Sequence, residues 1–197
     1  IYMAKKNEAT DIVNMTHSFI TVLHDAVKIS DGRLFVSLEQ ELEVVDKYLV
    51  IQEYRYRDRF TIEYDTDQTL ADCLVPKTIL QPIVENALLH GLLPINRVGH
   101  IKIATAAIDG QLQIQIEDDG MGMSQQSIDQ IMDTDQNWPE GEAHAGSAMR
   151  SIGLNNVQQR IRYLCGENYG LAIESEQGSF TRVQIKLPIN RANLDKI

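Results

Sequence analysis

The spacing of apolar residues changes near residue 57, and this change is the strongest constraint on the fold. Before residue 57, apolar side chains recur every three or four positions, as they do along one face of an α-helix. Beyond it, Phe60, Ile62 and Tyr64 alternate with polar residues, which is the period of a half-buried strand. The chain therefore begins with helices and continues into a domain that contains a β-sheet, with a boundary near residues 57–59.

The helical part, residues 1–58, divides into two predicted helices. The first runs through about residue 28 and is broken at Ser30–Gly32; its apolar positions are Ile12, Met15, Phe19, Val22 and Ala26. Ser37 and Gln40 have the spacing of a capping box, which predicts that a second helix begins there. We interpret the two as part of a helical hairpin. Its apolar seam either docks on the rest of the chain or pairs with a second copy, and the heptad-like pattern favours pairing.

The second part, residues 59–197, is predicted to be an α+β fold: a two-layer α/β sandwich with helices on one face of a mostly antiparallel sheet. Asp109–Gly110 separates two alternating segments and predicts a tight hairpin. The stretch Asp133–Arg150 shows no sustained periodicity and predicts a long loop of the kind that serves as a lid. Helices are predicted over Lys77–Gly91, with Pro76 at the first helical position, from about Ser124, and over Ile152–Leu164.

Composition limits the ligands that the chain can take. It has 18 Lys and Arg against 28 Asp and Glu, a net charge of −10, which excludes a nucleic-acid interface built on a basic surface. A polyanionic ligand would need a metal ion or a local electropositive pocket. Cys73 and Cys165 have neither metal-binding nor redox spacing, so an intracellular setting is the default expectation. No apolar run approaches the roughly eighteen residues of a membrane span.

Three clusters combine polar residues with features that suit a ligand. Asn86 and His90, beside the polar Glu85, lie four apart on a predicted helix; they either form a solvated face or hold a metal ion or phosphate. The run Asp118–Gly122 follows a strand, and is either a turn or a strand-end carboxylate whose glycines admit a ligand to the backbone. The run Ser151–Asn156 is predicted at a helix start, where free backbone N–H groups favour phosphate; the alternative is a helix start with a tolerated glycine.

These clusters lie in motifs that resemble a known family. The run Val75–Gly91 resembles the N box of LytS-type sensor histidine kinases, within the superfamily of gyrase, heat-shock chaperone, histidine-kinase and mismatch-repair ATPases. Asp118–Gly122 resembles the G1 box, Ser151–Asn156 the G2 box, and Glu176–Thr181 the final glycine box. The segment Ser37–Phe60 resembles the helix that precedes the ATP domain. The resemblance covers nearly the whole chain and implies a Bergerat-type ATP-binding fold.

The resemblance implies ATP and Mg²⁺ as ligands and a role for each motif. Asp118 would bind the adenine amino group, and Gly120 and Gly122 would shape the base pocket. Asn86 would hold the Mg²⁺ that bridges the phosphates, and the loop at residues 133–150 would be the ATP lid. For His90, a phosphate contact and a packing role both remain open. The other implied binding residues are Ser151, Gly153, Leu154, Asn156 and Thr181, and the implied catalytic set is Glu85, Asn86 and His90.

Three residues depart from the family pattern. Ser151 stands where the G2 box usually has its first glycine, and Leu89 stands where related kinases often have Lys. Pro82 stands where the gyrase branch places its catalytic Glu, one helical turn before Asn86. Without that base, activation of water for hydrolysis has no obvious agent, so transfer to a protein side chain fits better.

The resemblance implies the ATP-binding catalytic region of a two-component sensor histidine kinase. The family's phosphoacceptor histidine lies in an Asn-Pro-His-Phe-Leu-Phe-Asn motif, which we expect upstream of Ile1; His17 and His24 are weaker candidates. From that histidine the phosphoryl group would pass to the receiver domain of a response regulator. The expected setting is a homodimer in the cytoplasmic portion of a membrane sensor. The alternatives are an ATP-gated interaction module that transfers nothing and an ATPase of the gyrase branch.

Overall fold

The computed structural model describes residues 33–132 and 145–191, and within the helix that begins at Ala145 it describes side chains from Gly153 on. The elements of these ranges are β1 (Phe35–Ser37), α3 (Leu38–Arg55), β2 (Phe60–Asp65), the 3₁₀ turn η2 (Gln68–Leu70), β3 (Leu74–Pro76), α4 (Leu80–Asn86), the π-helix η3 (Ala87–Leu92), β4 (Gly99–Ile108), β5 (Gln111–Asp118), α5 (Gln125–Met132), α6 (Ala145–Cys165), β6 (Gly170–Glu176) and β7 (Phe180–Pro188). None of the helices in this part of the chain is both long and apolar enough to cross a membrane.

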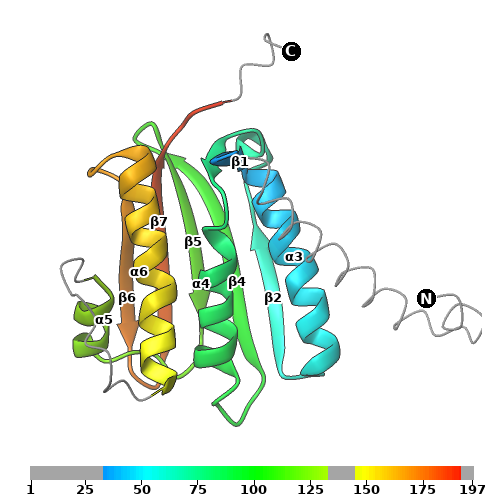
Figure 1. Ribbon diagram of the computed structural model, residues 1–197. Coiled ribbons are helices and arrows are strands. Elements are labelled where there is room, and N and C mark those ends of the chain that lie inside the picture. Colours follow the sequence, from blue (N-terminus) through cyan, green and yellow to red (C-terminus); the bar gives the residue numbers. More distant parts are fainter. Residues whose placement is uncertain (1–32, 133–144, 192–197) are drawn as a thin grey trace, which may run out of the picture.

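The described residues form two layers, as expected for an α+β sandwich. A five-stranded sheet has the order β2-β4-β5-β7-β6, and helices α3, α4 and α6 lie side by side on one of its faces (Figure 1). Strand β2 runs parallel to β4, and the other neighbouring pairs are antiparallel. The short strands β1 and β3 pair separately beside the sheet. The predicted fold class is confirmed.

Apolar side chains at alternate positions of the central strands fill the space between the sheet and its helices. On β5, Leu112, Ile114 and Ile116 are fully buried in one core with residues of the three covering helices. Burying side chains of this size contributes about 1.5–3 kcal/mol each. Strands β4 and β5 meet at Asp109 and Gly110, both with positive φ (52° and 72°), so the predicted tight hairpin is confirmed.

The opposite face of the sheet carries charged side chains in register. Arg182 on β7 lies between Glu117 on β5 and Glu174 on β6, with N–O distances of 2.7 and 2.6 Å. On the neighbouring pair of strands, Lys102 contacts Glu63 at 2.7 Å. Partly exposed pairs of this kind contribute little to stability. They do keep this face polar, whereas the helix-covered face holds the core.

Helix α3 begins as its capping box predicts. The Ser37 hydroxyl accepts from the Gln40 backbone N–H at 3.2 Å, and the Gln40 side chain accepts from the Ser37 N–H at 3.1 Å. Along its seam, Leu38, Val45 and Leu49 are buried in the same core as the sheet. This seam therefore docks on the rest of the chain, the alternative that the pattern did not favour. The first predicted helix lies outside the described residues, and the boundary at residue 58 stays a prediction.

Helix α4 begins later than its sequence pattern predicts. Pro76 is not at the first helical position; it ends β3 and pairs with Phe35. Thr78 then adopts a left-handed conformation with φ of 62°, which no helix can continue through, so α4 begins at Leu80. Pro82 lies in its first turn, where a missing N–H costs no helical hydrogen bond. After residue 86 the helix widens into η3.

Helix α6 begins earlier than predicted. The expected loop at residues 133–150 and helix start at Ile152 are wrong in part, because α6 already begins at Ala145; residues 133–144 lie outside the described residues. Ala, Met and Arg in residues 145–150 are strong helix formers, and Gly146 among them hid the helical pattern. The Ser151–Asn156 segment consequently lies inside a helix, not at its mouth.

Candidate functional site

The candidate site begins with a carboxylate buried at the end of β5. Asp118 continues the series of core-facing positions on this strand, and only 3% of its surface is exposed. Its Oδ1 accepts a hydrogen bond from the Gly120 N–H at 3.0 Å. Burial of a carboxylate is costly unless it is hydrogen-bonded, so a core position is an unusual place for one without a function.

Two glycines let the backbone pack directly on Asp118. A Cβ atom on Gly91, in η3, would collide with the Asp118 carboxylate. A Cβ atom on Gly120 would collide with the Gly91 carbonyl, and the neighbouring Met121 N–H donates to that same carbonyl at 3.0 Å. The end of the predicted N box and the predicted G1 box are thus in direct contact through backbone that only glycine permits.

A third glycine joins the loop after β5 to the β6–β7 hairpin. Gly122 has a φ of 66°, and a Cβ atom there would collide with the Glu176 carbonyl. The Gly178 N–H donates to the Met121 carbonyl at 2.7 Å. The predicted final glycine box is therefore packed against the predicted G1 box.

Thr181 and Ser175 complete this end of the sheet. Thr181 lies directly opposite Asp118 in the β5–β7 ladder, so both side chains share the helix-covered face. The Ser175 hydroxyl lies 3.0 Å from the Thr181 hydroxyl and accepts from the Met123 N–H at 2.8 Å. Sequence reasoning missed Ser175, because a serine on an alternating strand gives no local signal of a long-range hydrogen bond.

Asn86 lies on the side of α4 that faces α6. It is 5% exposed and follows Pro82 by four residues, which places both on one face of the helix. A Cβ atom built on Gly153 would lie 4.0 Å from the Cβ of Pro82. The predicted G2 segment therefore packs against this face of α4. Leu154, the next residue of α6, is fully buried in the core.

His90 and Glu85 differ from Asn86 in their surroundings. His90 is half-buried in η3, where i→i+5 bonding changes the angular spacing, so the α-helical argument for a face shared with Asn86 does not carry over. Glu85 accepts from the Gln81 side chain at 2.8 Å. Burial raises the pKa of the Tyr48 hydroxyl, and the nearby Glu85 carboxylate raises it further. Because Tyr48 belongs to α3, Glu85 lies on the α3 side of α4.

Most of the predicted site residues gather at one end of the sandwich. The C-terminal end of α4 with η3, the loops beyond β5 and β6, and the N-terminal half of α6 lie at the lower end of Figure 1. Asn156 does not belong to this group: it is exposed and lines a groove with Arg160 and Tyr163. For Ser151 the structure gives only its place in α6, since its side chain lies outside the described part of the chain.

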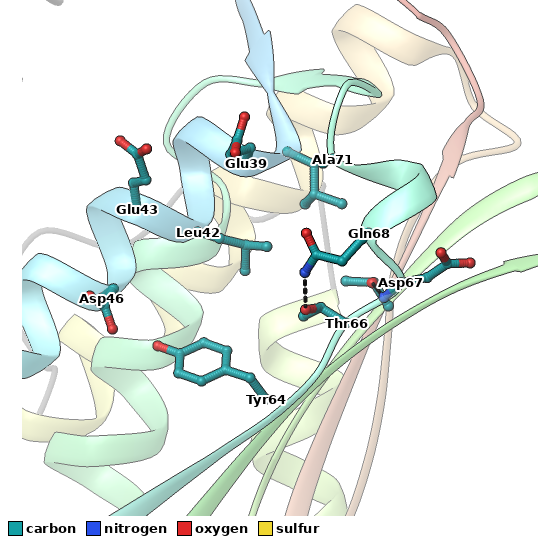
Figure 2. A pocket seen from close by; sticks show the side chains of 11 residues that line it. Glu39, Leu42, Glu43, Asp46, Tyr64, Thr66, Asp67, Gln68 and Ala71 are labelled. Carbon is teal, nitrogen blue, oxygen red and sulfur yellow. Dashed lines mark hydrogen bonds between the residues drawn. The ribbon is translucent and has the colours of Figure 1, made fainter.

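A separate groove of about 320 Å³ lies between α3 and β2 (Figure 2). Its floor includes Leu42, Ala71 and Tyr64, and its rim carries carboxylates such as Glu43 and Asp46. None of the predicted site residues lines it. The groove is therefore distinct from the candidate site.

Comparison with known proteins identifies the class of this chain. Residues 72–191 match the family described as histidine kinase-, DNA gyrase B-, and HSP90-like ATPase, and residues 1–60 match the family described as histidine kinase. The first match spans more than half of the chain, so the chain belongs to this ATPase family and carries its ATP-binding domain.

Individual proteins that resemble this chain narrow its class further. Sensor histidine kinase YesM of Bacillus subtilis is 32% identical over 187 residues, and sensor protein LytS of Staphylococcus saprophyticus is 34% identical over 164 residues. These alignments cover 95% and 82% of this chain but 29% and 26% of the two relatives, so the chain spans less than a third of their length. In fold, it resembles the catalytic domain of histidine kinase ThkA, with a TM-score of 0.55 at 15% identity over 80% of this chain and 97% of that domain. The resemblance to LytS-type sensor histidine kinases is confirmed.

Proposed function

We propose that this chain is the ATP-binding catalytic region of a two-component sensor histidine kinase. In the full protein, the γ-phosphoryl group of ATP would pass to a histidine upstream of Ile1, and from there to the receiver domain of a response regulator. The observation that carries the proposal is the buried Asp118 carboxylate with Gly91 and Gly120 packed on it, in a chain that belongs to this ATPase family. A homodimer in the cytoplasmic portion of a membrane sensor is part of the same proposal.

The residues at this end of the sandwich suit a purine nucleotide. The Asp118 carboxylate would accept from the adenine amino group; Thr181, opposite it in the β5–β7 ladder, supports this role. Gly120 and Gly122 would shape the base pocket indirectly, because they let the loop after β5 pack directly on Gly91 and on the β6–β7 hairpin.

The phosphate end would lie between α4 and α6. Asn86 is the proposed ligand of Mg²⁺, which would neutralise the phosphate charge when bound. Gly153 lacks a side chain where α6 meets α4, so this chain can approach a phosphate closely there. Ser151 and His90 remain proposed phosphate-side residues. Leu154 would support the phosphate end only through its packing in the core, and Asn156, which lies apart from the other site residues, is left out of the proposal.

The catalytic contribution of this chain would be positioning. Asn86 and the helix that carries it would orient the phosphates towards the acceptor histidine, and little covalent chemistry is left for the protein to perform. Glu85, held by Gln81 on the side of α4 that faces α3, is the proposed residue on the acceptor side. Since α3 continues the predicted hairpin, this is the side from which an upstream histidine would approach.

Labelling with γ-labelled ATP tests this function. The present chain and a longer form that includes the upstream helix are each incubated with Mg²⁺ and labelled ATP, with Asp118→Asn in both as the binding-deficient control. Label on the longer form alone supports the kinase. Release of free phosphate by both forms would instead support a gyrase-branch ATPase, and nucleotide binding with neither product would support an ATP-gated interaction module.

A further inference from the structure

Among the residues that the structure describes, one charged side chain is buried outside the candidate site. Glu41 on α3 is only 5% exposed, and its carboxylate accepts three backbone hydrogen bonds from the segment that leads into α4. The donors are the N–H groups of Thr78 at 2.6 Å, Ile79 at 3.0 Å and Leu80 at 3.2 Å. The first N–H groups of a helix have no partner within the helix, and α4 has no side-chain cap of its own. Glu41 therefore caps α4 from a different helix.

The local backbone is shaped around this carboxylate. Thr78 has a φ of 62°, which is unfavourable for a β-branched residue, and this turn aims three successive N–H groups at one side chain. A carboxylate at a helix N-terminus also interacts favourably with the helix dipole. Burial raises the pKa of Glu41, and the three N–H groups and the Arg160 charge oppose that shift.

Helix α6 contacts the same turn from its other side. The Arg160 guanidinium donates to the Lys77 carbonyl at 2.7 Å and to the Thr78 carbonyl at 3.5 Å. Arg160 follows Gly153 by seven residues, so both lie on the face of α6 that packs against α4. The turn before α4 is thus held between Glu41 of α3 and Arg160 of α6.

We propose that Glu41 and Arg160 are positioning residues for the nucleotide site, which they act on through α4. The helix has seven residues and so spans about 10 Å, and its other end is Asn86. A short helix fixed at its first turn has little freedom at its last, so the clamp sets where Asn86 stands. A displacement of α3 would move Asn86 by the same route. This inference rests on the proposed function, because it assigns Asn86 to nucleotide binding.

The affinity for Mg²⁺-ATP, measured by calorimetry on the whole chain, tests the clamp. Glu41→Gln leaves one acceptor for three donors, and Arg160→Gln removes the contact to the Lys77 carbonyl. We expect each to raise the Kd by about threefold to thirtyfold, the usual range for residues that couple a site without touching its ligand. Glu43→Gln, on an exposed position of α3, is the matched control and should change the Kd by less than twofold. Circular dichroism confirms that each variant compared is folded.

Two further measurements separate positioning from a general loss of stability. Arg160→Lys keeps a charged donor and should restore part of the affinity lost in Arg160→Gln; equal losses in the two variants would overturn the role of Arg160. Without nucleotide, amide hydrogen exchange through residues 79–86 should accelerate in Glu41→Gln and not in Glu43→Gln. If Glu41→Gln and Arg160→Gln are folded and bind Mg²⁺-ATP with the same affinity as the unmodified chain, the proposal is overturned. Absence of binding by the unmodified chain would refute the proposed function, whereas the exchange result would still decide whether Glu41 holds α4.

Discussion

Replacing Gly122 with alanine tests whether the loop after β5 is built on close backbone contact. The change has two separable effects in this structure. The residue has a φ of 66°, which costs an L-amino acid about 1–2 kcal/mol. Its Cβ atom would also collide with the Glu176 carbonyl, which is backbone and cannot rotate away; forced overpacking of this kind costs about 1–3 kcal/mol. We therefore expect Gly122→Ala to lower the free energy of unfolding by about 2–5 kcal/mol.

Gly110 provides the matched control for this prediction. Its φ is 72°, almost the same as that of Gly122, but nothing lies within 4 Å of the position that a Cβ would take. Gly110→Ala should therefore show the backbone cost alone, about 1–2 kcal/mol. Urea unfolding of both variants gives the two free energies of unfolding. Equal slopes of the transitions would show that the denatured state is the same in both. Equal losses of stability in the two variants would refute the proposed contact between the loop after β5 and the β6–β7 hairpin.

Three further changes test other parts of the structure. Asp118→Asn should weaken ATP binding by about tenfold to a hundredfold, the loss expected for a hydrogen bond to a charged group, while circular dichroism shows an intact fold; unchanged affinity would contradict the base-binding role. Ser37→Ala should lower the free energy of unfolding by about 1 kcal/mol through loss of the α3 cap, with unchanged nucleotide affinity in calorimetry. Burial, and to a smaller extent the nearby Asp46 carboxylate, raises the pKa of Tyr64 to about 12. The protonated form is therefore favoured in the fold, and stability should fall as the pH rises from about 10 to 12; Tyr64→Phe should reduce this fall, which denaturant titrations over that range would detect.

Much of the fold was predictable because its signals are local. Strand alternation, the capping box at Ser37 and the turn at Asp109–Gly110 each act within a few residues, so the sequence alone indicates them. The run Asp118–Gly122 could also be predicted, because its carboxylate and two glycines lie within five consecutive residues directly after a strand.

The parts that sequence reasoning missed depend on partners far along the chain. The start of α4 is set by Thr78 and by Glu41, which lies 37 residues earlier than Thr78, and no local pattern reveals a cap supplied by another helix. The docking of α3 was missed for a related reason, because its apolar seam has the same spacing whether it meets a second copy or the sheet of its own chain. The role of Ser175 follows only from strand register.

The ion pairs on the sheet face opposite the helices affect whether two such domains can associate through that face. Arg182 is flanked by Glu117 and Glu174 on neighbouring strands, so cations and anions alternate across that surface. A second molecule stacked on it would have to dehydrate these ions, which is costly. Crowding two of these domains together would therefore not make them adhere sheet to sheet, and each would keep its freedom to turn.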